Sequence, residues 1–384
     1  MEDVSRSSLS EMRRQKKKRR NTQKFLGFVI ILTVILGLYV SRERWMPNFK
    51  IDNSGYTDDE ISGDGFPLKI SNSTNYKSCG TSEGFAVLTD TRLYYYSASG
   101  EQTDVRQHTY SNTILKNAGK RILIYEQNGN SIRVDGRREE MYEKKMDNSI
   151  YLASVSSRGY TAVVTESDQY VCELRVFDQM GDEVYFRGCS ERITDVVFKN
   201  EGKGCYFISL DVYEGHIISQ IDSIDFENTE AGWTAENIET CPVSVFVSET
   251  DDVVLFGDSM CTFYSSEGSK VMDYQYPGIL TDASYCDSGA AMIFENKERK
   301  STTLAVINNP SSGNVTEVKI QNSFRSVEAC ENAVYLLAEN AIDAYDYEGR
   351  IIRTTELTEP FRGFYKSGKY VFLEGHNKIE RIEF

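Results

Sequence analysis

The sequence predicts an all-β protein, an eight-bladed β-propeller that follows one N-terminal transmembrane helix. Three observations support this prediction. A hairpin-turn pattern returns about every 40 residues, eight short apolar runs divide residues 65–384, and an uncharged apolar stretch follows a basic tail. Tyr and Phe are abundant, at 24 and 19 residues, whereas Pro occurs only six times, and this usage favours strands over helices.

Residues 1–24 form a basic tail, with nine Lys and Arg residues against three Asp and Glu residues. The net charge of the whole chain is −15, so the +6 of the tail leaves −21 on the remainder. A body with this charge repels a phosphate backbone, and nucleic-acid binding is therefore not predicted. On its own, such a tail is typical of a solvated, disordered segment.

Residues 25–41 are predicted to form a transmembrane signal-anchor helix. Residues 25–40 are sixteen uncharged, mostly apolar residues between Lys24 and Arg42. A membrane span needs about 20 residues, and the two flanking side chains can snorkel to make up the difference. Two alternatives are a buried core helix, which a basic tail does not normally precede, and a cleaved signal peptide, which needs small residues at its cleavage site.

The charge on either side of this span predicts the orientation of the protein. Positive residues are more numerous before residue 25 than just after residue 41, which keeps the N-terminus in the cytoplasm. The expected location is the cell membrane, crossed once, with the lipid bilayer as a partner through residues 25–41 and the C-terminal domain extracellular. The basic tail would then lie near anionic lipid headgroups.

Residues 42–64 are predicted to be a linker, because they are rich in Gly, Ser, Asn and Asp and lack sustained apolar periodicity. The acidic cluster at residues 57–60 lacks the spacing of a calcium-binding loop. We interpret it as a solvated segment.

The hairpin-turn pattern consists of an aromatic residue, three polar or small residues and a glycine. Glycine takes positive φ without a Cβ clash, and flanking alternation supplies two strands. Related turns are expected at residues 134–136 and 307–313. The four clearest copies are residues 96–100, 177–181, 264–268 and 345–349.

The eight apolar runs predict the second strand of each blade. Continuous apolarity, rather than alternation, is expected where both faces of a strand are covered, as between neighbouring blades. Eight runs in 320 residues give 40 residues per blade, and seven blades is the alternative. The runs are residues 85–88, 122–125, 162–164, 206–208, 253–256, 291–294, 334–337 and 370–373.

Residues 66–70 are predicted to close the ring. The final repeat, residues 361–384, has room for three strands, so the fourth is expected from the N-terminal side of the domain. Pairing of this N-terminal strand with the last blade would remove an exposed sheet edge. Pro67 fits an outermost strand, because proline has no N–H to donate to a further strand. The propeller domain therefore spans residues 65–384.

With a basic tail, one span and the motif Phe66-Pro67-Leu68 before the blades, the chain resembles a family of uncharacterised, single-pass, membrane-anchored propeller proteins. That family occurs in Gram-positive, clostridial-type bacteria and has WD40-like or quinoprotein-like blades. The resemblance implies the fold and the location but no catalytic residues. Trp233 is the only Trp in residues 65–384, and quinoprotein tryptophan docking is absent, so no cofactor is predicted.

No motif for catalysis or metal binding is apparent. Three histidines are too few and too scattered for a zinc site, and there is no nucleophile elbow or phosphate-binding glycine loop. No catalytic residue and no metal ligand is therefore assigned.

Eight cysteines follow the span. Cys79, Cys286 and Cys330 recur at the end of first strands, which favours a packing role. Cys172 and Cys189 flank one hairpin turn, and a two-residue loop would place them directly opposite each other, where a disulfide is possible. A three-residue loop would shift the register and separate them.

A carboxylate follows each of the eight apolar runs within three residues. Because the turns between second and third strands share one face of a propeller, the eight would form a wide acidic rim rather than a metal cage. The rim could attract a basic partner or cations, or the carboxylates could simply mark solvent-facing strand ends. They are Asp90, Glu126, Glu166, Asp211, Asp258, Glu295, Glu339 and Glu374.

These observations favour a membrane-tethered, extracytoplasmic interaction module that binds a protein or an envelope polymer without catalysis. The alternative is a carbohydrate-active enzyme of the glycosidase or lyase type, which needs two carboxyls about 5–10 Å apart near the propeller channel. Asp195, Asp282 and Asp287 are the candidates for that role. A sensor that signals through the short tail is a third possibility.

Overall fold

The computed structural model describes residues 65–384, apart from residues 71–75, 137–138, 201, 229–231 and 297–300. They belong to a compact unit, Glu60–Phe384. The basic tail, the apolar stretch 25–41 and the linker lie outside the described residues. Within the part that is described, no helix is long and apolar enough to cross a membrane.

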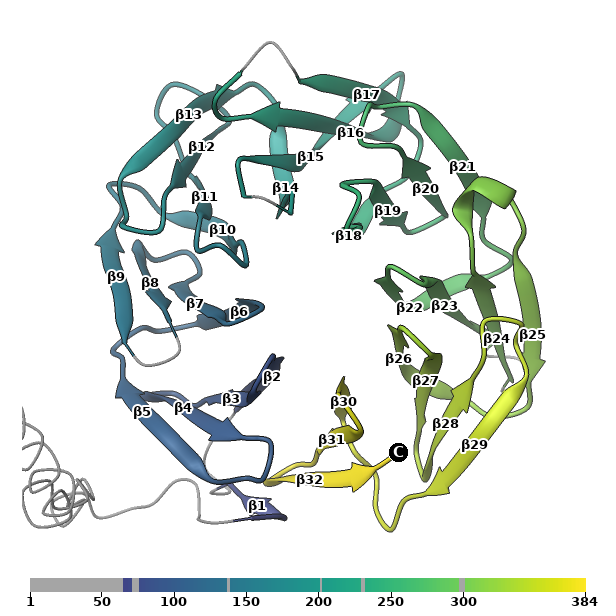
Figure 1. The fold of residues 1–384 in the computed structure, drawn as a ribbon. Helices are drawn as coiled ribbons and strands as arrows, with labels where there is room; N and C mark the ends of the chain where they lie inside the picture. The colour runs from purple at the N-terminus through teal and green to yellow at the C-terminus, as the bar shows by residue number, and fades with distance from the viewer. Residues whose placement is uncertain (1–64, 71–75, 137–138, 201, 229–231, 297–300) are drawn as a thin grey trace, which may run out of the picture. The chain divides into compact units, whose positions relative to one another are not determined.

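The described residues form eight four-stranded antiparallel sheets arranged around a central axis (Figure 1). We number these sheets as blades in chain order, from blade 1 (β2–β5) to blade 7 (β26–β29). Blade 8 contains β30–β32 together with β1, the first strand of the domain. The predicted eight-bladed propeller is therefore confirmed, and the seven-bladed alternative is wrong.

In each blade the strands follow one another outwards from the axis. The innermost strands are β2 (Lys77–Thr81), β6 (Thr113–Ala118), β10 (Ile150–Val155), β14 (Arg192–Phe198), β18 (Pro242–Val247), β22 (Ile279–Cys286), β26 (Phe324–Cys330) and β30 (Gly363–Ser367). The second strands are β3 (Gly84–Leu88), β7 (Arg121–Glu126), β11 (Thr161–Thr165), β15 (Gly204–Tyr213), β19 (Val253–Gly257), β23 (Gly289–Asn296), β27 (Ala333–Ala338) and β31 (Tyr370–Glu374).

The third strands are β4 (Arg92–Ser97), β8 (Ser131–Asp135), β12 (Cys172–Phe177), β16 (His216–Asp225), β20 (Met260–Tyr264), β24 (Ser301–Ile307), β28 (Ala341–Tyr345) and β32 (Lys378–Glu383). The outermost strands are β5 (Gln102–Gln107), β9 (Glu140–Lys145), β13 (Glu183–Cys189), β17 (Trp233–Ile238), β21 (Lys270–Gln275), β25 (Thr316–Ile320), β29 (Ile351–Glu356) and β1 (Leu68–Lys69). A 3₁₀ turn, η2 (Pro310–Ser312), precedes β25.

The apolar runs form the second strands, as predicted. All five residues of β3, β11 and β19 are buried. Buried apolar side chains form eight clusters, one at each interface between neighbouring blades. Both faces of a second strand therefore contact another blade, which is why its sequence is continuously apolar rather than alternating.

The four predicted hairpin turns connect third strands to outermost strands. Their glycines have φ values of 87° at Gly100, 86° at Gly181, 84° at Gly268 and 77° at Gly349. These values lie in the left-handed region that glycine adopts without strain. The repeated glycine in the sequence thus reports a repeated backbone conformation.

The ring closes as predicted, through pairing of the first and last strands. Leu68 lies opposite Ile379, and Lys69 lies opposite Lys378, in antiparallel register. The side chain of Leu68 is fully buried in the cluster between blades 8 and 1. The Ile70 N–H extends the pairing by donating to the Asn377 carbonyl at 2.7 Å.

Bulges near the start of five innermost strands were not predicted. In each, the register with the second strand shifts by one residue. A bulge takes one residue out of the ladder and redirects its side chain. Val243, for example, is 60% exposed although it belongs to an innermost strand. The five unpaired residues are Tyr151, Thr194, Val243, Thr281 and Arg325.

Candidate functional site

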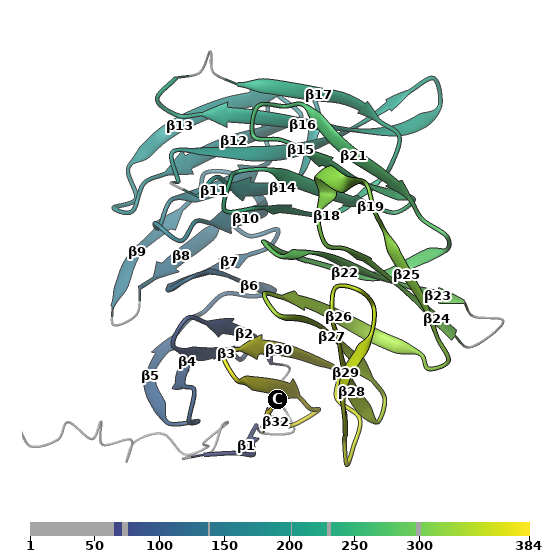
Figure 2. The same ribbon diagram turned by 45° about the vertical axis from the view of Figure 1, so that its right-hand side comes forward.

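The strand order places the eight predicted carboxylates at one end of the blades. Each second strand runs towards this end, and the connections between blades return there (Figure 2). We call this end the carboxylate face. Four second strands include their carboxylate: β7 and β31 end at Glu126 and Glu374, whereas β15 and β23 continue past Asp211 and Glu295. The eight are Asp90, Glu126, Glu166, Asp211, Asp258, Glu295, Glu339 and Glu374.

Three of these carboxylates have structural partners. Glu126 accepts hydrogen bonds from the Ser111 hydroxyl at 2.5 Å and the Ser111 N–H at 3.1 Å, and these bonds lower its pKa. Asp258 accepts the Cys241 N–H at 3.0 Å, just before β18. Glu374 accepts a hydrogen bond from the Ser78 hydroxyl of blade 1. These side chains fix the segments that lead into innermost strands or join two blades.

The remaining carboxylates contribute mainly charge. Asp90, Glu166, Asp211 and Glu339 are exposed, whereas Glu295 is half-buried. Among the described residues, no three His, Cys, Asp or Glu side chains are close enough together to hold a metal ion. The geometry is that of a dispersed acidic ring, which can act on a partner by long-range attraction.

The innermost strands carry carboxyl groups that bind the backbone of the next blade. Asp282 accepts the Val327 N–H at 2.8 Å and the Ser326 hydroxyl at 3.0 Å. Glu328 accepts the Lys366 N–H at 2.8 Å, in blade 8. Desolvation raises the pKa of Asp282 and raises that of Glu328 to about 8. Their shared partners are backbone amides, so these carboxyls join adjacent blades.

The other two candidates for catalysis also have backbone partners. Asp195 accepts the N–H of its neighbour Val196 at 2.9 Å, and desolvation raises its pKa. Asp287 is exposed at the end of the blade opposite the carboxylate face and accepts the Glu249 N–H at 2.6 Å. Asp282 lies within β22 whereas Asp287 follows its end, so these two candidates occupy different parts of blade 6.

A protruding hairpin on the carboxylate face was not predicted. β15 and β16 are ten residues each and remain paired as far as Tyr213 and His216. Three apolar side chains near the end are exposed: Val212 by 64%, Tyr213 by 60% and Ile217 by 48%. The signal in the sequence is the segment Asp211–Ile218, which continues the strand alternation past the apolar run.

A small groove on the same face lies between the innermost strands of blades 5 and 6. It has a volume of about 270 Å³ and is lined by Phe246, Asp258, Leu280 and Asp282, among others. Ile279 at its edge is 69% exposed. The carboxylate face therefore combines acidic and exposed apolar side chains.

Cys172 and Cys189 are directly opposite each other in the β12–β13 pairing, and both are buried free thiols. The loop has neither of the two lengths considered, because Phe177 is opposite Glu183 and five residues separate them. A bulge between Val176 and Phe177 restores the register. The disulfide itself stays a prediction.

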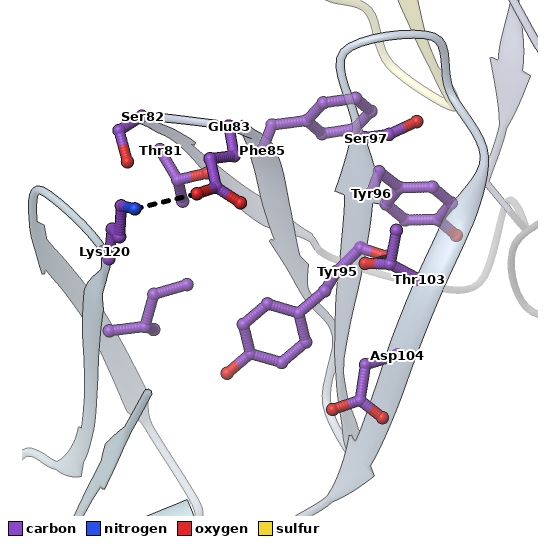
Figure 3. A pocket seen from close by; sticks show the side chains of 11 residues that line it. Thr81, Ser82, Glu83, Phe85, Tyr95, Tyr96, Ser97, Thr103, Asp104 and Lys120 are labelled. Carbon is purple, nitrogen blue, oxygen red and sulfur yellow. Dashed lines mark hydrogen bonds and ion pairs between the residues drawn. The ribbon is translucent and has the colours of Figure 1, made fainter. Parts of the chain in front are cut away.

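A cavity of about 800 Å³ lies between blades 1 and 2, at the end opposite the carboxylate face (Figure 3). The Lys120 ammonium of blade 2 lies 2.9 Å from the Glu83 carboxylate of blade 1. The ring of Tyr95 and the carboxylate of Asp104 also line this cavity. No sequence motif indicated it, because its wall is formed by residues far apart in the chain.

Charged groups beside this cavity neutralise one another. The Tyr95 hydroxyl donates to Asp135 at 2.7 Å, and Arg106 lies 3.3 Å from Asp135 and 2.7 Å from Asp104. Arg133 lies 3.1 Å from Asp135, which is only 1% exposed. This network links blade 1 to blade 2, and removal of one partner would leave a buried charge uncompensated.

Solved structures with similar folds support the architecture. BamB from Moraxella catarrhalis matches with a TM-score of 0.55 and 10% identity, over 84% of this chain and 97% of that chain. Sqt1 from Saccharomyces cerevisiae matches with a TM-score of 0.56 and 10% identity, over 81% and 98%. A eukaryotic initiation factor gives 0.58 and 12%, over 84% and 88%. Such low identities show the fold alone.

The sequence comparisons are more limited. No curated protein matches the chain. Residues 53–384 match the family model DUF5711, which is described as a family of unknown function. This match agrees with the resemblance to an uncharacterised propeller family, and the chain therefore belongs to the DUF5711 family.

Proposed function

We propose that the protein is a membrane-tethered, extracytoplasmic interaction module that binds a cationic partner through its carboxylate face. The partner is a protein or an envelope polymer outside the cell. The observation that carries the proposal is the coincidence of acidic and exposed apolar side chains on this face. Charge there would attract the partner, and the apolar side chains would provide the contact area.

The path of the chain supports this arrangement. The Gly65 N–H lies 3.4 Å from the carbonyl of Gly100, a turn residue at the end opposite the carboxylate face. From there β1 runs towards Ile70, which pairs with Asn377 at the carboxylate face. The chain thus enters the propeller opposite the carboxylate face. The predicted linker and tether are therefore connected in the chain to the end opposite the carboxylate face.

A charge-neutralising variant tests the proposal. We expect Asp90→Asn, Glu166→Gln and Glu339→Gln together to weaken binding of a fluorescent polylysine peptide to the full chain by about tenfold at low salt. Three fewer negative charges reduce the attraction, and raising the salt should reduce binding of the wild type. Fluorescence anisotropy at two salt concentrations measures both effects.

The matched control neutralises three exposed carboxylates at the opposite end: Glu101→Gln, Glu267→Gln and Glu331→Gln. This variant has the same net charge as the first. Equal loss of binding in both variants would show that the attraction is a property of the whole acidic domain, and the proposed role of the carboxylate face would be wrong.

A further inference from the structure

The end of the β15–β16 hairpin, Asp211–Ile218, projects beyond its blade. The innermost strand β14 pairs with β15 only as far as Leu210, opposite Arg192. The outermost strand β17 pairs with β16 only as far as Ser219, opposite Ile238. Within the described residues, the segment Asp211–Ile218 is therefore a two-stranded ribbon with no third strand at either edge.

The ribbon keeps its shape without those neighbours. Glu214 and Gly215 have φ values of 50° and 87°, which are characteristic of the two-residue turn that matches strand twist. On the β15 edge, the Val212 N–H donates to the Asp211 carboxylate at 2.7 Å. On the β16 edge, the register places the N–H and carbonyl of Ile217 outwards, because Tyr213 and His216 form the hydrogen-bonded pair next to the turn.

The two faces of the ribbon differ in chemistry. Val212 and Ile217 are opposite each other, so both side chains lie on one face. Asp211, Tyr213, His216 and Ile218 lie on the other face, because side chains alternate along a strand. A strand added at the β16 edge would place its apolar residues beside Ile217. Its basic residues would lie on the opposite face, where Asp211 is one strand further away.

We propose that the Asp211–Ile218 ribbon captures a partner polypeptide as an added strand with alternating basic and apolar residues. This inference rests on the proposed function and specifies where and in what conformation the partner binds. Backbone hydrogen bonds to the β16 edge would provide affinity, and the alternating side chains would provide selectivity. A second copy of the chain is disfavoured as the occupant, because its own β16 (His216–Asp225) contains no Lys or Arg.

The test compares hairpin variants for binding to a fluorescent twelve-residue peptide of alternating Lys and Val. We expect Val212→Ser with Ile217→Ser to weaken binding to the full chain by about tenfold or more, because two apolar contacts are lost. This variant leaves every charge in place. The matched control, Ile351→Ser with Ile352→Ser on β29, changes two side chains that are each 56% exposed and should bind like the wild type.

Three other outcomes overturn the inference. If the peptide binds but neither double variant weakens it, the ribbon is not the docking element, although a cationic partner could still use the carboxylate face. If the peptide does not bind at any salt concentration, the proposed function fails as well. If light scattering shows that the wild type dimerises and the Val212→Ser, Ile217→Ser variant does not, the occupant is a second copy.

Discussion

Glu328 shows how a single side chain in the propeller can couple stability to pH. Its carboxyl accepts the backbone N–H of Lys366 from the next blade. Its pKa is raised from 4.5 to about 8, chiefly by loss of solvent and also by the nearby Asp282, whereas the Lys366 N–H and ammonium lower it. In the folded protein this carboxyl therefore retains its proton at pH values where the unfolded chain has lost it.

The resulting stabilisation is complete below about pH 4.5 and disappears as the pH rises through about 8. We expect Glu328→Gln, which is neutral at every pH, to flatten the decline of Tm over this interval. Thermal unfolding of the full chain at a series of pH values measures the effect. Glu331→Gln, an exposed carboxylate in the same blade, is the control and should retain the wild-type profile. Parallel profiles for all three proteins would contradict the assignment.

At the scale of strands, a bulge decides whether two cysteines can meet. The bulge near Phe177 places Cys172 directly opposite Cys189, across β12 and β13. A hydrogen bond from the Cys189 thiol lowers the pKa of Cys172, which favours the thiolate form that reacts to give a disulfide. An oxidising environment outside the cell would favour a bond between them.

We expect Cys172 and Cys189 to form a disulfide in protein isolated from the outer side of the membrane. The bond would close a loop of about 17 residues and stabilise the protein by about 3 kcal/mol, so reduction should lower Tm. Non-reducing peptide mapping after alkylation with iodoacetamide identifies the linked peptides. The Cys172→Ser variant should show no response to reductant. Free labelling of both thiols in the native protein would disprove the bond.

The elements also show what the sequence could and could not predict. The apolar runs and the turn glycines are local signals, and they located the second strands and four hairpins correctly. The bulges, such as the one at Val243, are shifts in strand register that no local motif in the sequence marks. The Arg106–Asp135 contact joins two blades, and its residues look like ordinary surface charges in the sequence. Long-range packing decides such features.

For the candidate site, the sequence predicted the positions of the carboxylates but not their different uses. Composition cannot distinguish Glu126, which binds Ser111, from Glu166, which is exposed. The hairpin beyond Leu210 was missed because the apolar run ends before it. Apolar residues such as Val212 continue beyond the run and indicate a longer strand, but a search for continuous apolar runs does not detect them.

At the scale of the whole molecule, the membrane location that we propose depends on residues 25–41. We expect the full chain to remain in the membrane fraction after washing with high salt and with alkaline carbonate, because an apolar span is not released by either. A variant lacking residues 1–41 should be soluble and folded. Release of the full chain by salt alone would mean that only the basic tail contacts lipid, and a mature N-terminus beyond residue 41 would indicate cleavage.

Pairing of Leu68 with Ile379 also has a consequence for biosynthesis. The ribosome produces Leu68 long before it produces Ile379. Until then the last blade is incomplete and one β-strand edge of the nascent domain is unpaired. Until Ile379 has been made, the open edge can pair with a neighbouring chain instead. Truncated products from interrupted translation lack the last strands and cannot close the propeller. We expect quality-control proteases to recognise them.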